Sequence, residues 1–413
     1  MAPPPIYAVV PFVLMLMAIA IWPLVAPAWW HANRHKLLVA SCLACPVVVL
    51  YALHDPATLL HTCMEYLSFI IFLGALYAIS GGIRLHGDLR ATPRTNTIFL
   101  AVGSVLASWI GTTGASMLLI RPVLETNRER RFVTHTVIFF IFLVSNVSGL
   151  LSPLGDPPLF LGYLQGVPFG WPLTRLWPAW LVYVPLLLLV YFAWDGFAYR
   201  RETPEAREAD RRRVEPLQIQ GWGNALLLGL VVLAVAALPS PWRDGTIASA
   251  AALSILLTPR TIHRANAVTA YPIIEVAVLF FGIFFTMIPA LELLRHHGAT
   301  LGIQRPWHFF WATGILSSVL DNAPTYLVFL ALGQGLGLSN EVVGVSEATL
   351  MAISLGAVAF GANTYIGNAP NFMVKAIAEH AGVRMPSFFG YILYSSAILL
   401  PVHLLVTLLF LRD

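Results

Sequence analysis

Apolar stretches of about 18–25 residues recur along nearly the whole chain. Such a stretch crosses a hydrocarbon core of about 30 Å as an α-helix, whose backbone polar groups are satisfied internally. The pattern therefore predicts an all-α integral membrane protein with ten transmembrane helices. These helices are expected near residues 6–26, 37–53, 58–84, 132–166, 176–198, 222–239, 246–258, 267–294, 347–380 and 387–411.

Two further apolar stretches, 96–120 and 306–333, contain turn-forming residues at their centres. The centres read "GTTGA" at 111–115 and "DNAPT" at 321–325. Gly, Asn, Asp and Pro favour turns, and each half of such a stretch is too short to span a bilayer. We expect both stretches to form re-entrant hairpins.

Positive charge is distributed unevenly between the two sides that this topology defines. With ten crossings and two hairpins, 19 of the 24 Lys and Arg residues fall on one side. The side rich in Lys and Arg is cytoplasmic by the positive-inside rule. We therefore expect a multi-pass protein of the cell (inner) membrane with both termini outside the cytoplasm. The composition, 58% hydrophobic and 11% charged, excludes a soluble globular domain.

The two halves of the chain carry the same landmarks at a nearly constant offset. The hairpin centres Gly111 and Asp321 are 210 residues apart, and "SPLGDPPLFL" at 152–161 recurs as "TYIGNAPNFM" at 364–373. Five crossings per half is an odd number, so the second half enters the membrane from the opposite side. Inverted repeats of this kind are typical of secondary transporters. The expected division is a first repeat at 1–198, a cytoplasmic linker at 199–221 and a second repeat at 222–413.

A helix break in the first repeat contains a charge. The segment "NVSGLLSPLGDPPLF" at 146–160 places Asp156 between a glycine and two prolines. Proline stops the helix because it lacks an N–H group and clashes with the preceding turn. Burying a charge at this depth costs about 2.5–3.5 kcal/mol on insertion scales, which indicates a function.

The second repeat distributes its charge differently. Asn368 stands where the first break has Asp156, and the second hairpin tip has Asp321 where the first has Gly111. If each tip meets the break of its own half, two oxygen-lined half-sites result, each with one carboxylate and suited to Na⁺ or H⁺. Helix capping is the alternative role for both aspartates. The first half-site would contain Asp156, Ser152, Thr112 and Thr113, and the second Asp321, Asn322, Thr325, Thr364, Asn368 and Asn371.

Three further ionisable residues lie in or near apolar segments. Glu65 and Glu275 are 210 residues apart, each about two turns from the start of its helix, so each is either a structural partner or part of a proton relay. Lys375 follows the second break and either extends toward the cytoplasm or faces Asp321 as a counter-charge. No hydrolase, zinc-protease or Walker-type motif occurs in the sequence, so we expect no enzymatic activity and no cofactor beyond coupling ions.

The motifs "SPLGDPPLF", "SSVLDNAPTYL" and "GANTYIGNAPNFMV" resemble the ion transporter superfamily. They resemble in particular its citrate transporter branch, often labelled as sodium/proton antiporters, with more distant similarity to NhaD-type antiporters and divalent anion/sodium symporters. It implies an elevator-type homodimer in the lipid bilayer, with small ions or a carboxylate as substrate and no nucleic acid partner. The implied scaffold comprises about 1–95 and 222–304, and the transport part about 96–198 and 305–413. The implied ion-site residues are Thr112, Thr113, Asp321 and Asn322 at the tips, and Ser152, Gly155, Asp156, Thr364 and Asn368 at the breaks.

One departure from the resemblance bears on the substrate. The dicarboxylate symporters have a Ser-Asn-Thr tip in both hairpins, whereas the tips here begin with Thr112 and with Asp321. An aspartate at a tip would repel a carboxylate substrate unless a cation lies between them. Sodium/proton antiport is therefore favoured, and cation-coupled uptake of citrate or another carboxylate is the alternative. A membrane scaffold or receptor would leave both broken helices and both aspartates without a cause.

Alternating access predicts that the two hairpin tips change their exposure to water. Single cysteines at Thr113 and Ala323 should react with a small aqueous thiol reagent to an extent that depends on the transport state. The measurement is the labelling rate with and without the coupling ions. Equal protection of both positions in every state would contradict alternating access.

Overall fold

The computed structural model describes residues 4–337 and 341–412, which form helices and one two-stranded ribbon. Seven helices in these residues are long and apolar enough to cross a membrane, which agrees with a multi-pass membrane protein. Two shorter apolar helices, Gly223–Ala237 and Glu347–Asn363, accompany them. The number of true crossings and the inverted relation of the repeats stay predictions.

The two halves contain the same series of elements. In each half, two helices precede a long helix, a helical hairpin, a broken helix and a final long helix. The first half contains η1 (Ile6–Val9), α1 (Val10–Val25), α2 (Pro27–Trp30), α3 (Asn33–His54), α4 (Pro56–Gly81), α5 (Pro93–Ile110), α6 (Thr112–Thr126), α7 (Thr134–Leu143), η2 (Val147–Leu151), α8 (Pro157–Leu164) and α9 (Trp171–Arg200). The second contains α11 (Gly223–Ala237), α12 (Trp242–Leu257), α13 (Arg260–Ala265), α14 (Tyr271–His297), η3 (Gly298–Leu301), α15 (Pro306–Val319), α16 (Asn322–Gly335), α17 (Glu347–Phe360), η4 (Gly361–Asn363), α18 (Ala369–His380) and α19 (Phe388–Phe410).

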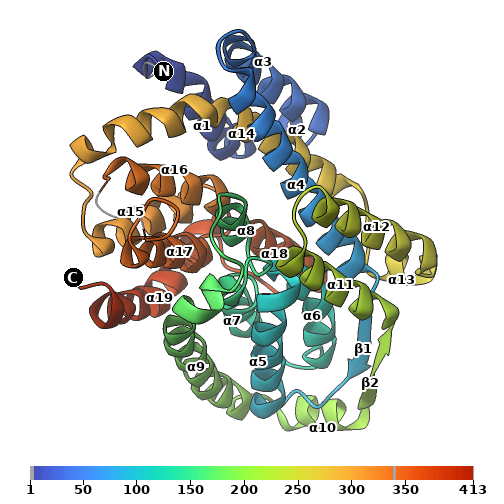
Figure 1. The fold of residues 1–413 in the computed structure, drawn as a ribbon. Coiled ribbons are helices and arrows are strands. Elements are labelled where there is room, and N and C mark those ends of the chain that lie inside the picture. Colours follow the sequence, from blue (N-terminus) through green and yellow to red (C-terminus); the bar gives the residue numbers. More distant parts are fainter. Residues whose placement is uncertain (1–3, 338–340, 413) are drawn as a thin grey trace.

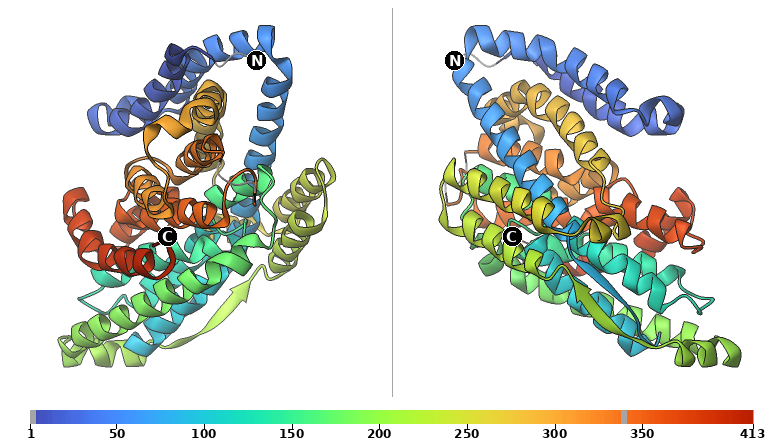
Figure 2. Two further views of the ribbon diagram at one scale, coloured as in Figure 1. Left: turned by 60° about the vertical axis from the view of Figure 1, so that its left-hand side comes forward. Right: turned by 90° about the vertical axis from the view of Figure 1, so that its right-hand side faces the viewer.

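The hairpins and broken helices lie at the centre of the molecule (Figure 1). The helices α1 to α4 and α14 run along the top of that view, and α11 to α13 lie at its right. Figure 2 shows α1 to α3 at one end of the molecule and α10 (Pro204–Arg212) at the opposite end. The division into scaffold and transport parts stays a prediction from the resemblance.

The two hairpins turn where the sequence predicts, with different chemistry. Gly111 ends α5 with a φ of 82°, a conformation that favours glycine, and α6 begins at the next residue. In the second hairpin the carboxylate of Asp321 accepts a hydrogen bond from the backbone N–H of Ala323 at 3.1 Å, which caps α16. The first tip thus depends on the backbone conformation of Gly111, and the second depends on the cap that the side chain of Asp321 provides.

The broken helices also begin and end near the predicted positions. Pro157 and Pro158 occupy the first turn of α8, where a missing N–H costs nothing. Pro370 takes the same place in α18. Asp156 and Asn368, the residues directly before these helices, have nearly the same backbone conformation, with φ/ψ of −148°/146° and −153°/140°.

The polar linker between the halves is more structured than the sequence analysis anticipates. Residues 199–221 contain α10 and the strand β2 (Glu215–Gln220), which pairs antiparallel with β1 (Arg84–Asp88). The expected helix at 58–84 therefore ends at Gly81, because the following residues extend to pair with β2. The segment "RLHG" at 84–87 belongs to β1, whereas the similar "RHHG" at 295–298 of the second half lies at the end of α14.

Asp88, at the end of β1, is buried beside other acidic residues. Burial, followed by the negative charges of Glu129 and Glu125, raises the pKa of this carboxyl from 3.8 to about 6. The folded protein therefore loses stability as the pH rises through that window, because the unfolded chain ionises more readily.

We expect Asp88→Asn to raise the apparent melting temperature in detergent by roughly 1–3 °C at about pH 7.5, with no gain at about pH 4. Asp55→Asn is the control, because Thr58 donates hydrogen bonds to Asp55 and lowers its pKa. This control variant should gain nothing at either pH. An equal gain for Asp88→Asn at both pH values would show that the charge is not the cause.

Candidate functional site

The carboxylate of Asp156 lies at the point where both hairpin tips and both helix breaks meet. Its side chain is 1% exposed. Thr112 Oγ1 donates to it at 2.7 Å, Asn322 Nδ2 at 2.5 Å and Asn368 Nδ2 at 3.1 Å. The donors come from the first hairpin tip, the second hairpin tip and the second break.

This arrangement corrects the expectation of two separate half-sites. The sequence analysis groups Asn322 and Asn368 with Asp321 in a second half-site, but both donate to the carboxylate of the first break. The first tip contacts the break of its own half through Thr112, whereas the second tip reaches the break of the first half through Asn322. Asn368 also donates to Asn146 Oδ1 at 3.2 Å, which joins the second break to the residues before the first.

Four helices begin at this carboxylate. Thr112 is the first residue of α6 and Asn322 the first of α16, while Asp156 and Asn368 directly precede α8 and α18. Each helix N-terminus carries a partial positive charge of about half an elementary charge, which stabilises an anion by about 0.3–1 kcal/mol. The helix ends therefore favour the ionised form of the carboxylate.

The side chains that donate hydrogen bonds to Asp156 are all neutral. No Lys, Arg or His of residues 4–337 and 341–412 donates to its carboxylate. Beside it, Asn322 Oδ1 is buried with no hydrogen-bond partner in this part of the chain. A buried carboxylate next to an unpaired amide oxygen is an oxygen-rich environment that suits a small hard cation or a proton.

Amide side chains form a continuous network between the two breaks. Asn146 Nδ2 donates to Asn371 Oδ1 at 2.7 Å, and Asn371 Nδ2 donates to the carbonyl oxygens of Gly361 and Thr364 at 2.8 and 2.9 Å. Both asparagines are fully buried. The side chain of Asn371 is thus linked to that of Asn368 through Asn146, and among the described residues it makes no hydrogen bond to Asp156.

Two predicted site hydroxyls hold the breaks against the hairpins. Ser152 donates to the carbonyl of Ser108, and Thr364 donates to the carbonyl of Ser318 at 2.5 Å. The backbone of Gly155 takes part as well, because its carbonyl accepts from the N–H of Thr112 at 2.8 Å. These groups position the first hairpin tip against the first break, and the second break against the end of α15.

The remaining predicted residues lie next to this centre. Asp321 is half-buried and caps α16, which is the alternative role, while its neighbour Asn322 reaches Asp156. Thr325 Oγ1 donates to the carbonyl of Asp321 at 2.9 Å. Thr113 is half-buried and follows Thr112 at the start of α6.

The three ionisable residues outside the motifs have partners elsewhere. Glu65 accepts from Gln165 Nε2 at 2.6 Å. Glu275 pairs with the buried Lys36 at 2.5 Å. Lys375 pairs with Glu379 at 3.2 Å, so it does not act as the counter-charge of Asp321 in this structure. The relay role of Glu65 and Glu275 stays a prediction, and their contacts fit the structural role.

Sequence reasoning missed part of the polar network. Asn146, Ser145 and Ser108 are fully buried, and Asn146 and Ser145 both contact Asn368. The signal was present in the sequence: Ser145 and Asn146 form a polar pair inside the apolar run that leads to the break. A polar pair at that depth is costly without partners, so its presence already indicated a buried site.

Over residues 2–411 the chain matches a protein family described as "Putative citrate transport". The match covers nearly the whole chain, including both hairpins and both breaks. Comparison with curated proteins gives no match.

The first break has no room for a side chain at Gly155. A Cβ atom there would overlap the backbone of Gly149, including its carbonyl oxygen. Because backbone atoms cannot turn aside, we expect Gly155→Ala to destabilise the protein by about 1–3 kcal/mol or more, seen as a lower apparent melting temperature. Gly170→Ala is the matched control, because nothing lies within 4 Å of a Cβ at that position. Similar melting temperatures for both variants would contradict the packing of the break.

Proposed function

The chain belongs to this citrate transport family, and we propose that it is a cation-coupled secondary transporter whose coupling ion, Na⁺ or H⁺, binds at Asp156. The observation that carries the proposal is the single buried carboxylate, held by neutral donors at the meeting point of four helix ends. Interrupted helices that meet at a buried polar centre are typical of secondary transporters.

The charge of Asp156 explains why a cation or proton would bind. Removing a carboxylate from water is costly, and neutral hydrogen-bond donors repay only part of that cost. A bound Na⁺ or a proton neutralises the carboxylate, and the two compete for the same oxygen atoms. Competition of this kind produces exchange when the carrier moves only with its site filled.

Sodium/proton antiport is therefore the specific function that we propose. Asp321 adjoins the same centre and is a second candidate ligand, although its carboxylate also caps α16. A carboxylate substrate would meet two acidic side chains there and no basic side chain that hydrogen-bonds Asp156 within the described residues. An elevator-type movement and a homodimer remain part of the proposal on the strength of the resemblance.

Cation-coupled symport of citrate or another carboxylate is the second candidate, and a specific observation favours it. Once Asp156 is neutralised, the N-termini of α6, α8, α16 and α18 would still point their partial positive charges at the centre. Such an arrangement can receive a substrate carboxylate. The description of the family agrees with this alternative.

Purified protein in liposomes with an internal pH-sensitive dye separates the two candidates. Antiport predicts proton movement on addition of Na⁺ alone, with Li⁺ and K⁺ as selectivity tests, and a loss of at least about tenfold in Asp156→Asn and in Asp321→Asn. Asp55→Asn is the control, because Asp55 caps the start of α4 and asparagine is also a good cap.

Each outcome of this experiment has a defined meaning. Citrate-dependent Na⁺ uptake without Na⁺-driven proton movement would establish the symport alternative. Wild-type exchange rates and Na⁺ affinity in both Asp156→Asn and Asp321→Asn would show that neither aspartate binds the coupling ion.

A further inference from the structure

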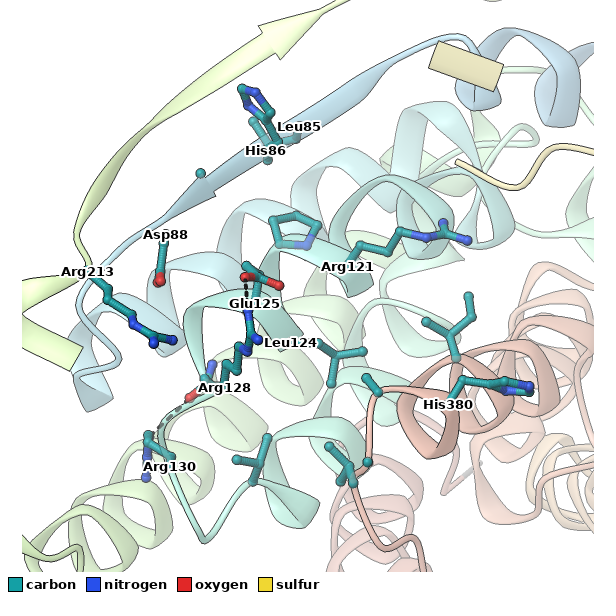
Figure 3. Close-up of a pocket in the computed structure, with 18 of the residues that line it drawn as sticks. Leu85, His86, Asp88, Arg121, Leu124, Glu125, Arg128, Arg130, Arg213 and His380 are labelled. Atoms are coloured by element: carbon teal, nitrogen blue, oxygen red, sulfur yellow. Dashed lines mark hydrogen bonds and ion pairs between the residues drawn. The ribbon is translucent and has the colours of Figure 1, made fainter. Parts of the chain in front are cut away.

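A large cavity of about 1840 Å³ opens at the far ends of α6 and α18, two of the four helices that begin at Asp156. It is lined by α6, α18, the β1–β2 ribbon and the loop between α6 and α7 (Figure 3). Arg121 on α6 is nine residues from Thr112, about 13 Å along a helix, and His380 ends α18. The cavity and the ion site therefore share two helices without sharing residues.

Eight arginines line this cavity, against three acidic residues. The acidic residues are Asp88, Glu125 and Glu215, and the arginines are Arg84, Arg121, Arg128, Arg130, Arg131, Arg212, Arg213 and Arg384. Four of the arginines already have ion-pair partners: Arg128 with Glu125, Arg130 with Asp195, Arg212 with Glu208 and Arg213 with Glu129. The other four, Arg84, Arg121, Arg131 and Arg384, form no ion pair within residues 4–337 and 341–412.

Arg121 provides the main evidence for an anion site in this cavity. Its Nη1 atom is buried and has no hydrogen-bond partner among the described residues. Figure 3 shows its side chain extending away from the paired Arg128 and Glu125. His86 Nδ1, on the ribbon that lines the same cavity, is also buried without a partner. A buried donor without an acceptor is costly, so Arg121 Nη1 calls for an acceptor from outside the chain, and His86 Nδ1 can donate or accept according to its tautomer.

The surrounding backbone cannot supply that much negative charge. The C-terminal ends of α6 and α18 each carry about half a negative elementary charge, roughly one in total. Asp88 and Glu215, which also line the cavity and form no ion pair among the described residues, supply up to two further negative charges, so the four arginines without ion-pair partners exceed the total by about one charge. The guanidinium fork matches carboxylate and phosphate groups, which it binds through two parallel hydrogen bonds.

We propose that this cavity binds a small oxyanion, a polycarboxylate or a phosphate group, with Arg121 and Arg84 as its principal contacts. The site lies on the side that the charge distribution predicts to be cytoplasmic. A bound anion would join α6, α18 and β1 at the ends opposite Asp156. This binding is separate from the transport function proposed above and does not require an ion at Asp156.

The test uses the full chain in nanodiscs of phosphatidylcholine, with citrate and inorganic phosphate as probes. The Asp156→Asn background removes the proposed ion site. We expect saturable binding by calorimetry of at least one probe, weakened about tenfold or more by Arg121→Gln and by Arg84→Gln. Arg175→Gln is the matched control, because Arg175 is an exposed arginine that pairs with Glu347 and does not line the cavity.

A second arm separates a soluble anion from a lipid headgroup. If a lipid headgroup phosphate is the ligand, an anionic phospholipid included in the nanodiscs should compete with the probes and abolish their binding. Stabilisation of the protein by that lipid, lost in Arg121→Gln, would then support the site with a lipid as its source.

Folding is checked by an unchanged melting temperature of each variant in the absence of anions. The proposal is overturned if neither probe nor anionic lipid gives an effect that depends on Arg121. It is also overturned if Asp156→Asn abolishes binding while Arg121→Gln retains it, because the probe would then occupy the ion site. If binding depends on Arg121 but the protein shows no Na⁺-driven proton movement, the anion site in the cavity is supported and the antiport proposal is contradicted.

Discussion

The hydrogen bonds to the carboxylate of Asp156 are the interaction on which the centre of this protein depends. The first hairpin, the second hairpin and the second break each send one donor to the same two oxygen atoms. Because the donors are far apart in sequence, the site exists only when both halves of the chain are packed together. Next to it, the amides of Asn146 and Asn371 hold one of these donors, Asn368, through a chain of hydrogen bonds. A change in the charge state of one carboxylate therefore acts on both hairpins at once.

The sequence predicted the order of the elements because the relevant signals are local. Apolar length gave the long helices, the prolines at 157 and 158 gave the start of α8, and Gly111 gave the first hairpin tip. Asp156 could be identified as a candidate site residue because a charge at a helix break inside an apolar run is costly. These inferences need no knowledge of which segments touch.

The parts that could not be predicted depend on contacts between distant segments. The pairing of β1 with β2 joins Arg84 to Gln220, and neither strand is distinguished by its own pattern. The convergence of Asn322 and Asn368 on Asp156, in place of two half-sites, depends on contacts between the two halves of the chain. The role of Asp321 as a helix cap was open in the sequence, because an aspartate before a helix serves equally well as a cap or as a ligand.

The β1–β2 ribbon has a mechanical consequence. β1 joins α4 to α5, and β2 lies on the path from α9 to α11, so the two covalent connections that bracket α5 to α9 are hydrogen-bonded to each other. Two unpaired connections could extend or shorten separately, whereas two hydrogen-bonded strands must move together. A displacement of α5 to α9 relative to α4 and α11 would therefore have to move both connections together as long as β1 and β2 stay paired.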